Sequence, residues 1–185
     1  MMRLLATFIY RLIGWRSVFV PPPGPKSVLL VYPHTSNWDF PLGVLFNAKH
    51  PIFIHWAGKD TLFRWPMGVL ARALGGVAIN RREHTGMVGQ LTRAFAERER
   101  FHLCITPEGT RSKTDHWKSG FYRLALEARV PVGLGFFDYR NKCVGVERWV
   151  TLSGDEEADL AMLREYYADK TACYPEKAGD IRFKS

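Results

Sequence analysis

The sequence predicts a single α/β domain with a central, mostly parallel sheet flanked by helices. Short apolar runs alternate with longer amphipathic segments, as in proteins whose parallel strands are joined by helices. The 185 residues are about one domain's worth, and a hydrophobic fraction of 46% is enough for a sizeable core. Polar clusters follow several apolar runs, where α/β proteins place their ligands. We expect residues 26–185 to form this domain and residues 1–25 to precede it as an amphipathic helix and a spacer.

Residues 1–20 are apolar but are interrupted by Arg3, Arg11 and Arg16. They fall short of the ~20 uncharged residues that a membrane-spanning helix needs. Arg11 also breaks the clean apolar core that a signal peptide would need. Two interpretations have equal support: an amphipathic helix at a membrane interface, and a helix packed on the domain. The sequence PPPGP that follows stops this helix and acts as a stiff spacer.

The main domain is predicted to begin with a buried strand over residues 27–32. Further strands are expected at 52–56, 76–79, 101–106, 130–137 and 142–150. Helices are expected at 38–49, 61–74, 85–100, 118–129 and 154–170. Pro66 should bend the second of these helices or defer its start. The tail from Pro175 is predicted to be loose.

The composition narrows the classes of partner. A net charge of +8 and a pI near 9.6 suggest nucleic acid, an anionic membrane or a phosphorylated ligand. The basic residues are dispersed, and no nucleic-acid-binding module is recognised, so nucleic acid is disfavoured. Six Trp and twelve Phe alongside this charge fit a membrane-surface protein. The three cysteines have no CxxC spacing, which favours a reducing, cytosolic setting, and Cys104 is expected to be buried and inert.

The first polar cluster is the sequence PHTSNWD at 33–39. It places His34 at the exit of a predicted strand and Asp39 in the first turn of the next helix. A carboxylate can hold one ring nitrogen of a histidine while the other acts as a general base. The alternative is structural, because Asn37 or Asp39 could simply cap the helix. No Ser or Cys stands out as a nucleophile, so a catalytic pair would activate a nucleophile supplied by a substrate.

Three further polar clusters lie at 75–82, 106–112 and 117–121. The first could deliver Arg81 and Arg82 to a phosphate, since guanidinium groups grip phosphate through two parallel hydrogen bonds; a solvated surface pair is the alternative. The second lacks the GxxxxGK[ST] pattern of a nucleotide-binding loop. Its Glu108 could accept a substrate hydroxyl or could pair with an arginine to order the loop. The third could place backbone amides and the ammonium of Lys118 near an anion, or could simply begin a helix.

Together these clusters resemble the lysophospholipid acyltransferase family, which includes the 1-acylglycerol-3-phosphate acyltransferases. The family's H-x4-D motif matches His34 to Asp39. Its glycine-containing strand that ends in arginine matches 75–81, and its P-E-G-T-R-S block is present unchanged at 107–112. An apolar run around proline at 130–132 matches the fourth block. The resemblance spans roughly residues 28–135.

The resemblance implies acyl transfer from a thioester, carried by coenzyme A or acyl carrier protein, to a lysolipid hydroxyl at the cytoplasmic face of an anionic membrane. It implies no metal or redox cofactor. His34 and Asp39 would be catalytic. The substrate-binding residues would be Arg81, Glu108, Gly109, Thr110, Arg111 and Lys118. Selectivity for acyl length would come from a groove within the one domain.

Two residues depart from the family pattern in the second block. Ala78 stands where a large apolar residue is usual and could widen the local pocket. Asn80 stands where an acidic residue is usual, which removes a negative charge beside the expected phosphate site. This could strengthen phosphate binding or indicate another acceptor, such as a lyso-aminolipid, a glycolipid or another hydroxyl. A non-catalytic lipid-binding protein is less consistent with the intact H-x4-D and PEGTRS motifs.

Overall fold

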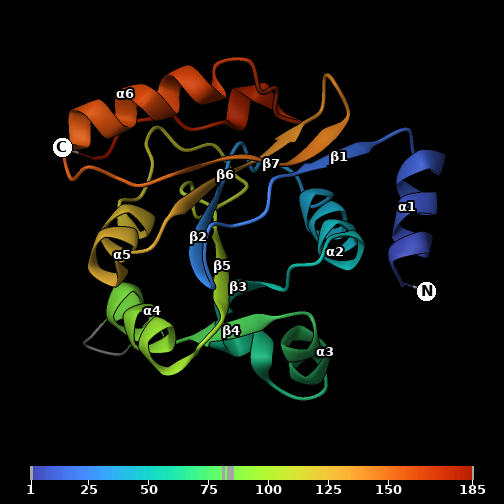
Figure 1. The fold of residues 1–185 in the computed structure, drawn as a ribbon, viewed down its shortest axis with the longest axis horizontal. Coiled ribbons are helices and arrows are strands. Elements are labelled where there is room, and N and C mark those ends of the chain that lie inside the picture. Colours follow the sequence, from blue (N-terminus) through green and yellow to red (C-terminus); the bar gives the residue numbers. More distant parts are fainter. Residues whose placement is uncertain (1, 81, 83–85, 185) are drawn as a thin grey trace.

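A seven-stranded sheet organises the part of the chain that the computed structural model describes, namely residues 2–80, 82 and 86–184 (Figure 1). The strand order is β1-β7-β6-β2-β5-β3-β4. All neighbours are parallel except β6 and β7, so the predicted mostly parallel sheet is confirmed. The strands are β1 Arg16–Phe19, β2 Lys26–Val31, β3 Ile54–Lys59, β4 Gly76–Ile79, β5 Phe101–Ile105, β6 Val132–Asp138 and β7 Cys143–Val150.

Helices cover both faces of this sheet. The α-helices are α1 Met2–Leu12, α2 Asp39–Lys49, α3 Met67–Ala73, α4 Gly86–Glu97, α5 Gly120–Ala128 and α6 Glu156–Tyr167. Short 3-10 helices occur at η1 Asp60–Phe63 and η2 Pro175–Lys177. Figure 1 shows α4, α5 and α6 on one side of the sheet and α1, α2 and α3 on the other. The expected α/β architecture is therefore observed, with three layers.

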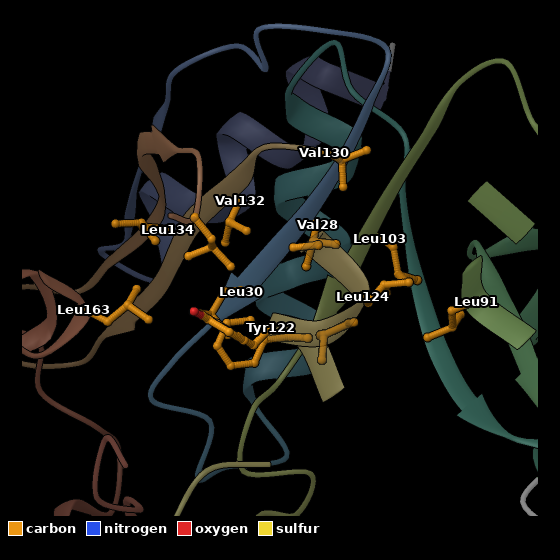
Figure 2. Close-up of a cluster of buried hydrophobic side chains, with 14 of the residues drawn as sticks. Val28, Leu30, Leu91, Leu103, Tyr122, Leu124, Val130, Val132, Leu134 and Leu163 are labelled. Carbon is orange, nitrogen blue, oxygen red and sulfur yellow. The ribbon is translucent and has the colours of Figure 1, made fainter. Parts of the chain in front are cut away.

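The side chains of β2 are buried on both faces of the sheet, which is typical of a central parallel strand. Val28 and Leu30 point towards α4, α5 and α6 and belong to the larger core cluster (Figure 2). Leu29 and Val31 point the other way, because successive side chains of a strand face opposite sides of the sheet. They pack with Phe46 of α2 in a second, smaller cluster. The strand that leads into the H-x4-D motif is thus fixed by packing on both faces.

The expectation of one helix over residues 1–20 is wrong at its C-terminal end. Helix α1 ends at Leu12, and Gly14 has a φ of 71°, a left-handed conformation that favours glycine. Residues 16–19 then form β1, which pairs in parallel with residues 143–146 of β7. An apolar run of this length has no periodicity that separates a short edge strand from a helix.

The expectation of a loose tail from Pro175 is also wrong. The amide of Trp117 donates to the carbonyl of Arg182, with N and O 2.8 Å apart. Phe183 packs against the larger core cluster. The C-terminal segment is therefore ordered and lies close to the site described next.

Pro66 was expected either to bend the helix predicted at 61–74 or to defer its start. The second outcome is observed, since η1 ends at Phe63 and α3 begins at Met67.

Candidate active site

His34 and Asp39 lie together beyond the C-terminal end of β2. Nδ1 of His34 is 2.9 Å from Oδ2 of Asp39, and the Asp39 carboxylate is buried at 1% exposure. The ring N–H direction is not aligned for a hydrogen bond across this distance, since Nδ1 finds no well-aligned partner in the described part of the chain. Catalytic hydrogen bonds often tighten only when substrate binds, so the short separation is the feature that matters for the pair. The pair has the spacing that a histidine base and its orienting carboxylate require.

Two other groups hold the Asp39 carboxylate in place. The amide of Ser36 donates to Oδ2 at 3.1 Å, and the hydroxyl of Tyr139 donates to Oδ1 at 2.5 Å. Tyr139 comes from the turn between β6 and β7, and its ring meets Trp15 edge-on at 5.0 Å between centroids. Burial, and secondly this hydrogen bond, raise the pKa of Tyr139, so the phenol remains a donor. Sequence reasoning missed Tyr139, which lies 100 residues from Asp39.

Glu108 occupies a structural position behind His34. Its Oε2 accepts a hydrogen bond from the His34 amide at 2.8 Å, and its Oε1 accepts one from the Gly179 amide at 3.2 Å. Burial raises the pKa of Glu108, while these two hydrogen bonds act in the opposite direction. The carboxylate is 1% exposed and does not line the cavity described below. Glu108 therefore links the His34 segment to the C-terminal tail. This role differs from the two expected from the sequence, which were to accept a substrate hydroxyl or to pair with an arginine.

Gly109, Thr110, Arg111 and Lys118 are brought together as expected, and all four line the same cavity as His34. Gly109 has a φ of 64°, and a β-carbon there would lie 2.7 Å from Nζ of Lys118. The backbone conformation therefore favours glycine at this position, and the flexible end of the lysine side chain occupies the space beside it. This arrangement places one ammonium and one guanidinium in the cavity that His34 opens into.

The cavity has a volume of about 470 Å³ and extends from His34 between α2 and the sheet. Its inner wall is mainly apolar and is formed by Leu29, Val31, Val44, Phe46, Phe137 and Val146. Cys104 also lines it, and burial raises the pKa of this thiol to about 12. A thiol with such a pKa remains protonated and is a weak nucleophile, as expected from the sequence, although Cys104 is partly rather than fully buried.

The second polar cluster is described only in part. Arg81 lies outside the described residues. Asn80 does not reach the cavity; its amide and carbonyl pair with the side chain of Gln90, and its side chain accepts from the Arg82 amide at 3.0 Å. Ala78 is exposed and also lies away from the cavity lining, so the local widening expected from it is not observed there. In the described chain, Asn80 organises a turn.

Among the described residues, no helix combines the length and the hydrophobicity that a membrane span requires. No group of three or more His, Cys, Asp or Glu side chains is placed to hold a metal ion in the same part of the chain.

The α/β sheet, with a His–Asp pair beyond a central strand and a largely apolar cavity beside it, is an arrangement that acyl transfer can use. The chain belongs to the Acyltransferase family, whose model matches residues 21–133. Among solved structures, it is similar to PlsC from Thermotoga maritima, a 1-acyl-sn-glycerophosphate (LPA) acyltransferase. That similarity has a TM-score of 0.57 at 15% sequence identity and covers 92% of this chain and 80% of PlsC. A comparison with curated protein sequences gave no match.

Proposed function

We propose that this acyltransferase moves a fatty acyl group from an acyl thioester to the hydroxyl of a lysophospholipid, and that the acceptor is 1-acylglycerol-3-phosphate in phospholipid synthesis. The observation that carries the proposal is the His34–Asp39 pair at a cavity with two cationic and several apolar walls. The cations suit a phosphate group, and the apolar walls suit an acyl chain. One site then receives both substrates of the reaction.

The chemistry begins at the ring nitrogen of His34 that faces away from Asp39. This Nε2 takes the proton of the acceptor hydroxyl, and the hydroxyl oxygen attacks the thioester carbonyl carbon. The tetrahedral intermediate then expels the thiolate, which recovers the proton from the imidazolium. Asp39 stabilises the imidazolium, and Tyr139 and the Ser36 amide fix the carboxylate. Positioned acid–base help of this kind contributes roughly 10²–10⁴-fold.

Side-chain cations are available in this cavity to stabilise negative charge. The backbone amides of His34 and Gly109 already donate to Glu108 and to the carbonyl of Thr106. Lys118 and Arg111 line the cavity with His34. We assign to these two side chains the acceptor phosphate and the developing oxyanion. Arg81, from the resemblance, would add a further phosphate contact.

The apolar part of the cavity would hold the acyl chain, and the thioester would come from acyl-coenzyme A or acyl carrier protein. A lipid acceptor places the enzyme peripherally on an anionic membrane, at its cytoplasmic face. Helix α1 supports this placement. It has features of both helices considered for the N-terminus, the one packed on the domain and the one at a membrane interface. Its Tyr10 is buried and donates to the carbonyl of Leu42, whereas Leu4, Leu5 and Phe8 are 56–76% exposed. One face of α1 is packed, and another is open to a membrane.

A product screen by mass spectrometry tests this function. The purified protein is offered acyl-coenzyme A and acyl-carrier-protein donors with phosphorylated and unphosphorylated lysolipid acceptors. We expect phosphatidic acid from 1-acylglycerol-3-phosphate as the main product. A product formed only from a lyso-aminolipid or a glycolipid would instead favour those alternative acceptors. No acylated product with any pair would contradict the proposed substrates.

A further inference from the structure

Large exposed apolar side chains are concentrated at two places in the described chain. One is α1. The other is the segment η1–α3 and the loop within it, where Leu62, Trp65, Met67, Val69 and Leu70 are 53–87% exposed. We call these five side chains the α3 patch. Scattered apolar side chains are normal at a protein surface, but five exposed ones between positions 62 and 70 are concentrated enough to indicate a surface that binds something.

The α3 patch belongs to the same layer of the molecule as α1 and α2. Trp56 of β3 meets Phe40 of α2 at 5.5 Å between ring centroids, and it meets Phe63 of η1 at 5.7 Å. A single strand side chain points to one face of a sheet, so α2 and η1 lie on the same face. Helix α1 packs on α2 through Tyr10. Figure 1 shows the three helices together on one side of the sheet, with α2 between α1 and α3.

The charge around the α3 patch fits an anionic partner. Lys59, Arg64 and Arg72 are exposed in this region, and Asp60 is its one acidic residue between positions 52 and 80. Trp65, the most exposed of the patch at 87%, has the amphipathic ring that is enriched at the headgroup level of membranes. Exposed apolar side chains flanked by cations are typical of surfaces that bind the interface of an anionic bilayer.

The α3 patch is continuous with the cavity of the active site. Leu62 belongs to the patch and also lines the cavity, as does its neighbour Lys59. Phe40 of α2 also lines the cavity and is itself 38% exposed. A bilayer that covered the α3 patch would therefore lie against the mouth of the cavity. A lipid could then pass from the bilayer into the cavity with little exposure of its chain to water.

We propose that η1–α3 is a second membrane-docking element, which acts together with α1 to seat the cavity mouth on an anionic bilayer. The two elements flank α2, so both can touch one surface. The inference rests on the proposed function, because it assigns a lipid surface as the source of the substrates. It adds a contact that the N-terminal helix alone does not provide.

The test measures binding of the full-length protein to sedimented vesicles of phosphatidylcholine with and without phosphatidylglycerol. The variant Met67→Gln/Val69→Gln/Leu70→Gln replaces three patch residues with a good helix former. We expect its partition coefficient to fall by about 10–100-fold, since binding scales with the apolar area that enters the interface. The control Leu126→Gln changes an exposed leucine of α5, in the opposite layer, and should bind like the wild type.

A charge reversal tests the same surface independently of helix stability. Arg64→Glu should weaken binding by about fivefold or more on phosphatidylglycerol vesicles and should have little effect on phosphatidylcholine alone. Unchanged partition of both variants, with normal thermal unfolding, would overturn the second docking element. If the triple variant unfolds, Arg64→Glu decides.

Turnover separates this inference from the proposed function. With a short-chain lysolipid dissolved as monomers, both variants should match the wild type, because no membrane is required. With the acceptor in vesicles, their turnover should fall in step with binding. Absence of product from the wild-type protein would contradict the proposed function, whereas the vesicle-binding result would still decide the docking element. Normal vesicle turnover with weakened binding would also count against docking as the route of substrate entry.

Discussion

Tyr139→Phe tests how the Asp39 carboxylate is held. The substitution removes the hydroxyl that donates to Oδ1 at 2.5 Å and keeps the ring that packs on Trp15. A hydrogen bond to a charged group contributes about 1.5–3 kcal/mol, and the oxygen would lose this donor in a residue that is 1% exposed. The carboxylate would then be held at Oδ2 by the Ser36 amide. We expect kcat to fall by about 10–100-fold, since each 1.4 kcal/mol is a factor of ten.

Steady-state kinetics measure the effect of Tyr139→Phe on kcat. Tyr166→Phe is the matched control, because it removes a hydroxyl that donates to the carbonyl of Leu134, away from the site. A folded Tyr139→Phe enzyme with wild-type kcat would refute the assignment of Tyr139 as a positioning residue.

Three further changes probe other parts of the structure. Glu108→Gln can accept only one of the two amide hydrogen bonds, so urea unfolding should show a loss of about 1–3 kcal/mol together with slower turnover. Lys118→Gln should raise KM for a phosphorylated acceptor by about 10–100-fold through the loss of a charge-assisted bond. Burial, and secondly Lys49, lower the pKa of His50 to about 4. The unfolded chain therefore binds this proton first, and the free energy of unfolding should fall as the pH decreases from 6.5 to 4, by at most ~1.4 kcal/mol per pH unit from this group.

Each of these expectations has a contradicting outcome. Wild-type stability of Glu108→Gln would show that the buried carboxylate does not hold the tail. An equal change in KM for phosphorylated and unphosphorylated acceptors would remove the phosphate role of Lys118. His50→Asn should flatten the pH dependence of unfolding between pH 4 and 6.5, and an unchanged slope would assign that dependence to other groups.

Local patterns in the sequence were sufficient for much of the fold and for the centre of the site. The buried run at 27–32 and the amphipathic segment after it correctly place His34 and Asp39 at a strand exit and a helix start. Strand β1 was not predicted, because it is four residues long and follows an apolar helix without a change of composition. A short edge strand is fixed by its partner, and β7 lies more than 120 residues away.

The contacts that hold His34 and Asp39 could not be predicted from the sequence for a related reason. Tyr139 and Gly179 lie 100 and 71 residues from the carboxylates that they bond. Neither belongs to a motif, and the tail around Gly179 has no periodic apolar pattern. Glu108 was located in the right loop, but its role depends on which way the buried side chain turns. Such roles are set by tertiary packing, which leaves no local spacing to detect.

The proposed reaction depends on activation of the acceptor hydroxyl by His34. The most direct measurement of this role is the rate of acylated product formation by His34→Ala, followed by mass spectrometry with the donor and acceptor that the wild type uses best. We expect a loss of roughly 10²–10⁴-fold, with thermal unfolding close to that of the wild type. Turnover at the wild-type rate by the folded variant would contradict the role of His34 as the general base.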